Sequence, residues 1–446
     1  MSVKFRVENQ SRNNRPMKNQ ISRRHFIGKS SVAAAGLFFI GKSGSFGRNK
    51  ISPNEKLNIG VIGVEHRAGD DLKEVSSQNI VALCDIDDNY LTAVSKNYSG
   101  AKTYNDFRKL LEQKDIDAVV IGTPDHTHAV ATAAALKSGR HVYCEKPLTH
   151  TVSEARIISQ LTKNHKAVTQ MGNQIHASDN YRRVVELVQS GAIGEIREVH
   201  VWVGATYGNT GKPVTAPEPS NLHYDLWLGP IEPHPYSPNY VPVKWRNYWA
   251  FGGGTMTDFC CHHMDLSHWA LDLRYPLTVE SEGPPVDEIE VPIWMISTFN
   301  YPARGSKPPV KLVWYQGAKR PPLPECSRES WPDDGTLFIG TKGKLQSSYD
   351  KHRLLPEQDF KDFVAPTLFI PNSIGHHNEW IEACKTGGPT TSNFDYAGAL
   401  TETGILGNVA YRVGKKIQWD TKNLRAKNCP EADKFIQHNY RKGWSL

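Results

Sequence analysis

The sequence has neither a disulfide framework nor a hydrophobic run long enough to cross a membrane. Its seven cysteines are an odd number, scattered along 446 residues without paired spacing. This is typical of buried thiols rather than of a small secreted protein held by disulfides. The apolar stretch at 32–40 is too short to span a bilayer as a helix. We therefore expect no stable membrane span after processing, in a chain long enough for two domains and a leader.

Positive charge is scarce outside the first 50 residues. Of the 53 Lys and Arg residues eleven lie in 1–50, whereas only one of the 46 Asp and Glu residues does, so the remainder carries 42 basic and 45 acidic residues. Because that part is slightly acidic and has no Arg/Lys stripe, we exclude nucleic acid as a partner. The sequence also lacks internal repeats, low-complexity tracts and any Ser/His/Asp or Cys/His nucleophile motif.

The basic head carries an export signal. Residues 22–27 have the sequence SRRHFI, a twin-arginine motif, and the apolar stretch at 32–40 and Lys42 follow it. No cysteine comes directly after this stretch, so we expect no lipid anchor. We predict that residues 1–50 are a leader that directs the folded protein to the periplasm or another extracytoplasmic compartment. A disordered basic tail is the alternative.

Between residues 55 and 175 short apolar runs alternate with stretches of helical periodicity. The expected strands are 57–64, 80–86, 118–124, 141–147 and 167–173. The expected helices between them are 70–77, 89–98, 106–113, 128–139 and 153–165. Near-continuous apolar strands are typical of a parallel sheet that helices cover on both faces. The pattern predicts an α/β fold whose N-terminal domain is a doubly wound Rossmann sheet at 55–175.

The pattern changes in the second half of the chain. Stretches at 197–204 and 310–317 have strand character and stand among loops rich in Pro and Trp. A hairpin is expected at 335–348, and an amphipathic helix at 378–387. We therefore predict that residues 176–446 form an α+β domain with a mostly antiparallel open sheet.

The turn after the first strand is a modified dinucleotide-binding turn. Rossmann domains hold pyrophosphate there with Gly-x-Gly-x-x-Gly, and this chain keeps Gly63 but has Glu65 and Ala68 at the other two positions. A carboxylate at 65 would repel phosphates unless it turns away or pairs with Arg67.

An acid stands at the spacing that Rossmann domains use to bind a ribose. Asp85 closes the second strand 22 residues after Gly63, where a carboxylate binds the ribose hydroxyls and favours NAD over NADP. A surface aspartate that merely ends a strand is the alternative. The candidate cofactor contacts in this part of the chain are Gly63, His66, Arg67 and Asp85.

The segment 252–269 carries an unusual polar stripe. Asp258, His262 and Asp265 are spaced i, i+4, i+7, so a helix places them on one face, beside apolar residues. There His262 can exchange a proton near neutral pH, and an aspartate can fix its tautomer. A stripe that faces solvent is the alternative. The run CCHH at 260–263 predicts no metal site, because adjacent helical residues point about 100° apart and cannot close a tetrahedron.

Three motifs in order identify a family resemblance. They are GTPDHTH at 122–128, CEKP at 144–147 and Gly-Gly-Gly-x-x-x-Asp-x-x-x-His at 252–262. Over roughly residues 55–420 the chain resembles the Gfo/Idh/MocA superfamily, which includes glucose–fructose oxidoreductase and inositol dehydrogenase. The resemblance implies a nicotinamide cofactor in the cleft between the Rossmann domain and a second domain, 176–446. That second domain would bind a small carbohydrate and mediate homodimers or homotetramers.

The resemblance also implies roles for individual residues. Lys146 matches the family's catalytic lysine, with a cis peptide to Pro147, and Asp258 and His262 match its catalytic partners. Asp265 matches an acid that contacts the sugar in some members. The positions that line the nicotinamide half of the cofactor are matched by Thr123, Pro124, His128, Glu145 and Asn173. A partly buried lysine beside a positively charged nicotinamide gives up its proton more readily, as a base for an alcohol must.

Aromatic and cationic residues in the second domain are candidates for the substrate side. Arg246 can donate to hydroxyls, and Trp249 can present an apolar face to a pyranose. The same contacts are open to Tyr207, Trp245 and Trp269, although a place in the aromatic core is as good an interpretation for each of these side chains.

Three functions follow as hypotheses. The first is an exported NAD(P)-dependent oxidoreductase acting on a secondary hydroxyl of a sugar, sugar alcohol or glycoside. Because NAD is not free outside the cytoplasm, the cofactor would stay tightly bound and be recycled by a second sugar. The second is a redox-assisted glycosidase, in which bound NAD returns unchanged after transient oxidation of a ring hydroxyl. The third is a sugar-binding descendant that has lost the cofactor, which Glu65 favours.

Overall fold

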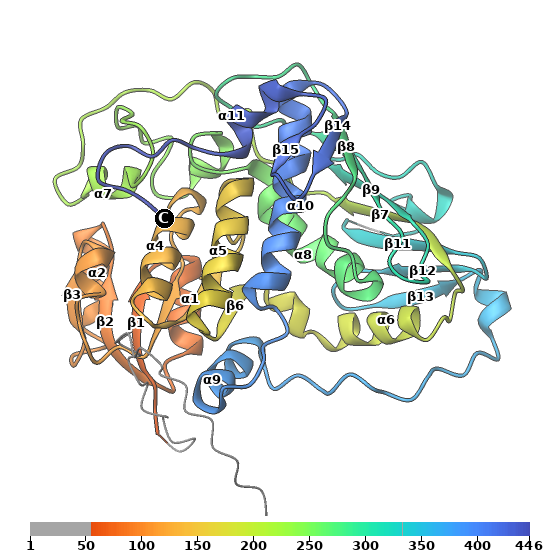
Figure 1. Ribbon diagram of the computed structural model, residues 1–446, viewed down its shortest axis with the longest axis horizontal. Helices are drawn as coiled ribbons and strands as arrows, with labels where there is room; N and C mark the ends of the chain where they lie inside the picture. Colours follow the sequence, from red (N-terminus) through yellow and green to blue (C-terminus); the bar gives the residue numbers. More distant parts are fainter. Residues whose placement is uncertain (1–54, 332) are drawn as a thin grey trace, which may run out of the picture. The chain divides into compact units, whose positions relative to one another are not determined.

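The computed structural model describes residues 55–331 and 333–446 (Figure 1). The twin-arginine motif and the apolar stretch after it lie outside these residues, so the leader stays a prediction. Within the described ranges, no helix combines the length and the apolar character needed to cross a membrane.

The N-terminal sheet is parallel throughout, as predicted. Its six strands have the order β3-β2-β1-β4-β5-β6, which is the doubly wound Rossmann order. The strands are β1 (Asn58–Ile62), β2 (Asn79–Cys84), β3 (Lys102–Tyr104), β4 (Ala118–Ile121), β5 (His141–Glu145) and β6 (Thr169–Gly172). Every residue of β4, β5 and β6 is buried, as in a parallel sheet covered on both faces; β4 is wholly apolar, whereas β5 and β6 also bury polar residues. The sequence pattern missed β3, because it has only three residues and two are exposed.

Helices cover both faces of this sheet. Those within the Rossmann part are α1 (Arg67–Glu74), α2 (Asp88–Ser95), α3 (Phe107–Leu110), α4 (Asp125–Lys137) and α5 (Val152–His165). Side-chain caps fix where several begin: the Asp87 carboxylate accepts the Asn89 N–H at the start of α2, and Thr151 and Glu154 form a capping box on α5. Local sequence therefore defines these helix ends.

The second sheet is mostly antiparallel, as predicted. It has the order β13-β12-β11-β7-β10-β9-β8-β14-β15, and its parallel neighbours are β7 and β10. Its strands are β7 (Ile196–Val203), β8 (Thr278–Glu282), β9 (Met295–Tyr301), β10 (Val310–Gln316), β11 (Gly335–Gly340), β12 (Lys344–Ser347), β13 (His352–Leu355), β14 (Ile417–Asp420) and β15 (Arg425–Ala426). The expected strands at 197–204 and 310–317 are β7 and β10, and the expected hairpin is β11–β12.

The remaining helices follow β6 along the chain. They are α6 (Asp179–Gln189), α7 (Tyr224–Leu228), α8 (Gly254–Leu271), α9 (His376–Thr386), α10 (Phe394–Val413) and α11 (Asp433–Ile436). Short 3-10 turns lie at Gln174–Ala177, Lys244–Asn247, Pro324–Cys326, Glu357–Phe360 and Pro430–Ala432. Helix α9 returns to the Rossmann part, where Trp380 packs in one core with Val61 and Tyr143. The chain therefore crosses to the Rossmann part after β13 and returns to the second sheet for β14 and β15.

A buried ion pair fastens α5 to α10 beside the second sheet. The Arg156 guanidinium donates to both oxygens of Glu402, at 2.8 and 3.0 Å, and to the Thr421 carbonyl. The indole of Trp419 donates to the same carboxylate. Burial raises the pKa of Glu402, and Arg156 opposes that shift. The two helices also approach closely, because a Cβ at Gly398 would stand 2.2 Å from the Ser159 hydroxyl.

Replacing Arg156 with Ala should lower the free energy of unfolding by about 3 kcal/mol at pH 7, since it leaves the Glu402 carboxylate buried without its counter-charge. Urea unfolding followed by circular dichroism measures the change. The double variant R156M/E402L, which removes both charges, should recover part of the loss. Equal stability of the wild type and R156A would contradict this account of the ion pair.

Candidate functional site

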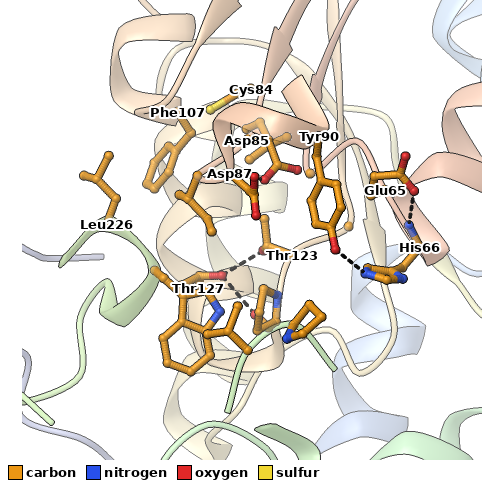
Figure 2. Close-up of a pocket in the computed structure, with 18 of the residues that line it drawn as sticks. Glu65, His66, Cys84, Asp85, Asp87, Tyr90, Phe107, Thr123, Thr127 and Leu226 are labelled. Carbon is orange, nitrogen blue, oxygen red and sulfur yellow. Dashed lines mark hydrogen bonds between the residues drawn. The ribbon is translucent and has the colours of Figure 1, made fainter. Parts of the chain in front are cut away.

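A pocket opens at the carboxyl ends of the Rossmann strands and contains about 1190 Å³ of space, its open mouth included. Figure 2 shows Asp85, Tyr90, Phe107 and Thr123 around it. Its walls come from three parts of the chain: the Rossmann loops, the segment 222–246 and Trp444 near the C-terminus. In open α/β sheets this edge, where the strand order reverses, is the ligand-binding edge.

The glycine turn after β1 is tightly packed. Gly63 has φ +86°, and a Cβ there would stand 2.9 Å from the Gly122 carbonyl oxygen. At Gly122 a Cβ would stand 2.6 Å from the Cβ of Ala68 on α1. The ends of β1 and β4 therefore meet the start of α1 with no room for side chains, which leaves backbone to face a ligand. This arrangement fits a dinucleotide.

Glu65 does not pair with Arg67. Its carboxylate accepts the backbone N–H of His66 at 3.3 Å, within its own turn, and Figure 2 shows it at the margin of the pocket. Of the two arrangements that would relieve repulsion, pairing with Arg67 does not occur, because Arg67 bonds to Asp71 and Glu145 instead. His66 lines the pocket, and its ring contacts Tyr90 edge-on.

Asp85 is held at the end of β2 by backbone groups. Its carboxylate accepts the N–H of Val64 at 2.9 Å and the N–H of Asp87 at 3.0 Å. Burial raises the pKa of Asp85, and these two hydrogen bonds oppose the shift. The carboxylate lines the pocket beside the glycine turn, which is where an acid meets the adenosine ribose in this fold.

Under the turn lies a buried pair of carboxyl groups. Asp71 and Glu145 share one cation, because Arg67 donates to Asp71 at 2.7 Å and to Glu145 at 3.2 Å. The Nε2 atom of His377 on α9 lies 2.9 Å from Oδ1 of Asp71, and the Gln174 amide donates to Glu145. Burial and mutual repulsion raise the pKa of Glu145, and burial raises that of Asp71, because one arginine cannot neutralise two ionised groups. The pair therefore keeps a proton in the folded protein.

Lys146 and Asp258 meet between the two halves of the chain. The Lys146 ammonium donates to Oδ1 of Asp258, and the Tyr207 hydroxyl donates to Oδ2 at 2.8 Å. Arg246 Nε lies 3.3 Å from Oδ1. Burial alone would raise the pKa of Asp258, but Lys146 and Arg246 hold it well below its usual range. Asp258 is therefore ionised, and its contacts bring together the segments that carry Lys146, Tyr207 and Arg246. The Lys146–Pro147 peptide is cis, as the family resemblance implied.

His262 lies one turn further along α8. Burial and the Lys146 charge lower the pKa of its imidazole well below the usual value, so the ring is neutral at pH 7. Its Nδ1 atom has no hydrogen-bond partner among the described residues, and the Tyr181 hydroxyl fixes its backbone carbonyl at 3.0 Å. The solvent-facing alternative for this stripe is excluded, because Asp258 is 5% and Asp265 0% exposed.

Asp125 is a neighbouring residue that reasoning from the sequence missed. It begins α4 within the GTPDHTH motif, is fully buried, and its Oδ1 atom has no partner among the described residues. Burial raises its pKa to about 7, with Arg246 opposing and Asp258 adding to the shift. The motif spacing was the available signal, although it did not show that the carboxyl faces Arg246.

The remaining predicted cofactor residues divide into two groups. Thr123 and Pro124 line the pocket. His128 lies behind them, with its ring between the carbonyls of Thr123 and Pro147, each at 2.7 Å. Burial lowers its pKa to about 4 and the two carbonyls oppose that shift, because a neutral imidazole has one N–H and donates to only one of them. The ring therefore packs between the two loops that carry Thr123 and Lys146. Asn173 is buried and accepts from the Ser392 hydroxyl at 2.6 Å, while its amide nitrogen has no described partner.

Two predicted substrate residues lie outside the pocket lining. Asp265 is fully buried, and its carboxylate accepts from His176 at 2.8 Å and from the Tyr396 hydroxyl at 2.6 Å. Trp249 donates to the Asp287 carbonyl, and the Arg412 guanidinium covers its ring at 4.8 Å. Both side chains already have partners inside the protein. Arg246, the third, lines the pocket with its guanidinium over the Trp245 ring.

Comparison with known proteins establishes the class to which this fold and site belong. A family model described as "Oxidoreductase family, NAD-binding Rossmann fold" matches residues 57–173, and one described as "Oxidoreductase family, C-terminal alpha/beta domain" matches residues 182–308. Together they match more than half of the chain. The chain belongs to the Gfo/Idh/MocA oxidoreductase family, and its first domain is that family's NAD-binding domain.

Individual relatives match over shorter stretches. Inositol 2-dehydrogenase of Salmonella typhimurium is 33% identical over 150 residues, which are 32% of this chain and 45% of the relative. Myo-inositol 2-dehydrogenase of Thermotoga maritima is 27% identical over 139 residues, 31% of this chain and 41% of the relative. The chain therefore spans somewhat less than half the length of these curated relatives.

Solved structures share the fold. The WlbA dehydrogenase from Bordetella pertussis, in complex with NADH and UDP-GlcNAcA, has a TM-score of 0.58 at 17% identity, over 82% of this chain and 99% of that one. Aldose–aldose oxidoreductase from Caulobacter crescentus, complexed with glycerol, has a TM-score of 0.54 at 17% identity, over 82% and 100%.

The buried carboxyl pair predicts a pH dependence of stability. Glu145 has an ordinary pKa of 4.5, and its pKa is raised in the folded protein. At a pH between the ordinary pKa and the raised pKa of Glu145, the folded protein holds a proton that the unfolded chain has released. The free energy of unfolding should therefore fall as pH rises above about 4.5. The variant E145Q removes one titrating group and should lose less stability than the wild type between pH 5 and pH 8.

Urea unfolding at both pH values, without added NAD, measures this difference. The exposed residue Glu112 gives a control, E112Q, whose pH dependence should match that of the wild type. Parallel pH curves for the wild type and E145Q would contradict a shared proton under the glycine turn.

Proposed function

We propose that this protein is an NAD-dependent oxidoreductase that oxidises a secondary hydroxyl of a sugar or polyol. The observation that carries the proposal is the ion pair between Lys146, which lines the pocket, and Asp258, with the neutral His262 one turn further along α8. The names of the relatives support the substrate class, since they are inositol dehydrogenases, and the fold neighbours include an aldose–aldose oxidoreductase.

The residues that would hold NAD are the Gly63 turn for the pyrophosphate, Asp85 for the adenosine ribose, and Thr123 and Pro124 for the nicotinamide half. When bound, the nicotinamide supplies the acceptor for the hydride that leaves the alcohol carbon. The pocket fits this group, because the glycine turn is bare and Asp85 lines the pocket beside it.

The proton of the alcohol goes to His262. Its imidazole is neutral at pH 7, and because burial and Lys146 lower its pKa it acts as a relay that passes the proton on, whereas the Lys146 ammonium is held in an ion pair by Asp258 and can donate to the alcohol oxygen. Lys146 then orients the hydroxyl and stabilises negative charge that develops on its oxygen. The family resemblance implied that Lys146 is the base; this proposal instead gives Lys146 the role of donor, because its ammonium bonds to Asp258.

We also propose that the protein acts outside the cytoplasm with NAD tightly bound. The twin-arginine motif at 22–27 supports export of the folded protein. A resident cofactor suits that location, because a second sugar or polyol can return it to its starting state without free NAD. We propose a homodimer or homotetramer on the family resemblance.

A redox-assisted glycosidase is the second candidate, and Tyr207 favours it. Its hydroxyl lies on the same carboxylate as Lys146, and burial and Asp258 raise its pKa, so the phenol stays protonated. An elimination and the later addition of water need an acid or base beyond the one that oxidises the alcohol. Release of an aglycone from both α- and β-linked glycosides without added NAD would establish this reaction, and accumulation of a ketosugar would exclude it.

Replacing His262 with Asn should lower kcat by about 10²- to 10⁴-fold, because it removes the proton acceptor, and K146M should cause a similar loss. Neither side chain supports the pyrophosphate turn, so the Kd for NAD should change little. Steady-state kinetics with a panel of sugars and polyols, together with NAD titration, measures both effects. The exposed Lys137 gives the matched control K137M, which should retain wild-type activity. Full activity of H262N would overturn the assigned base.

Replacing Asp85 with Ala should weaken NAD binding by roughly tenfold and reduce the preference for NAD over NADP, because the carboxylate that binds the ribose hydroxyls and repels a 2′-phosphate is lost. Calorimetric titration of each cofactor measures the two Kd values. The control D115N changes an exposed acid away from the pocket. If the wild type binds neither cofactor, the protein is a sugar-binding descendant and the proposed function fails.

A further inference from the structure

The last ten residues of the chain cross from the second domain to the Rossmann pocket. We call residues 437–446 the C-terminal strap. Figure 1 shows it in dark blue, running from α11 past α7 to end beside α4. The matched family models end at residue 308, and the motifs that carry the family resemblance end at residue 262. The strap is therefore a feature of this chain that the family match does not cover.

Two residues, Tyr440 and Arg441, make the polar contacts that hold the middle of the strap. The Tyr440 hydroxyl donates to Glu154 on α5 at 2.5 Å. The Arg441 guanidinium donates to the Gly229 carbonyl at 2.6 Å and to both the side chain and the carbonyl of Asp225 on α7. The ring of His438 stacks on His150 with centroids 5.2 Å apart. These contacts hold the strap against α5 and against α7, which lines the pocket.

The end of the strap forms part of the pocket wall. The Trp444 ring lies 5.9 Å from the Phe107 ring, and the Arg108 guanidinium covers it at 4.5 Å. Trp444 lines the pocket together with Phe107 and Leu226, which Figure 2 shows on the same side of it. This is the side of β2 and β3, where Asp85 marks the adenosine half of a dinucleotide.

We propose that the C-terminal strap closes the adenosine end of the pocket and thereby retains NAD as a resident cofactor. This inference rests on the proposed function, which supplies the NAD. Trp444 and Phe107 offer flat apolar faces to an adenine base, which stacks readily on aromatic side chains. The Tyr440 and Arg441 contacts keep this wall in place, so NAD leaves only when the strap detaches.

The test measures release of NAD rather than turnover. The full-length protein is loaded with isotopically labelled NAD and chased with excess unlabelled NAD, and the label that remains bound is measured by mass spectrometry. The variants W444A and a truncation after Gln437 should release the label at least tenfold faster than the wild type. R441A, which removes the anchor on α7, should also release it faster. W444F keeps an aromatic face and should stay close to the wild-type rate, as should K442A, which changes an exposed residue of the same strap.

The outcomes separate the two proposals. If the wild type binds NAD and W444A, R441A and the truncation release it at the wild-type rate, the strap proposal is overturned and the proposed function stands. If the wild type binds no NAD, both are overturned. Should the truncated chain fail to fold by circular dichroism, W444A decides the matter, because its substitution removes one half-exposed side chain at the chain end.

Discussion

The site depends on one buried carboxylate. Asp258 on α8 accepts from Lys146, which follows β5, and from Tyr207, and it faces the Arg246 guanidinium. An isolated buried carboxylate is costly, so Asp258 is stable only when its partners arrive from separate segments. The same contacts hold Lys146 beside the neutral His262. The contacts that join the two halves of the chain are therefore the same contacts that position Lys146 and Asp258.

Electrostatics divides the pocket into parts with different tasks. At the Lys146 end, cations surround Asp258 and leave the nearby imidazole uncharged. Beneath the glycine turn, by contrast, Asp71 and Glu145 share one arginine and keep a proton. At the adenosine end aromatic side chains line the pocket, Tyr90 and Phe107 from the Rossmann part and Trp444 from the C-terminal strap. A bound cofactor would thus contact charged groups at the Lys146 end, hydrogen-bonding groups at the glycine turn and apolar rings at the adenosine end.

Much of the fold could be predicted from the sequence. Strands buried on both faces have continuous apolar runs, so β1, β4 and β5 were visible in the sequence, as were the helices between them. The three residues of β3 were too few and too exposed to give a pattern. The packing of α9 against the Rossmann core could not be predicted either, because periodicity shows that a helix has a buried face but does not show what covers it.

The sequence by itself determined the fold class, the glycine turn with its distant acid, and the motifs that contain Lys146, Asp258 and His262. Those features depend on local periodicity and fixed spacing, which are properties of the chain alone. Tertiary structure decided which side chains join them: it brings in Arg246 and Trp444 and leaves Asp265 with internal partners. Lys146 and Asp258 are 112 residues apart, and contacts over such separations are set by how helices and sheets pack, which spacing does not record.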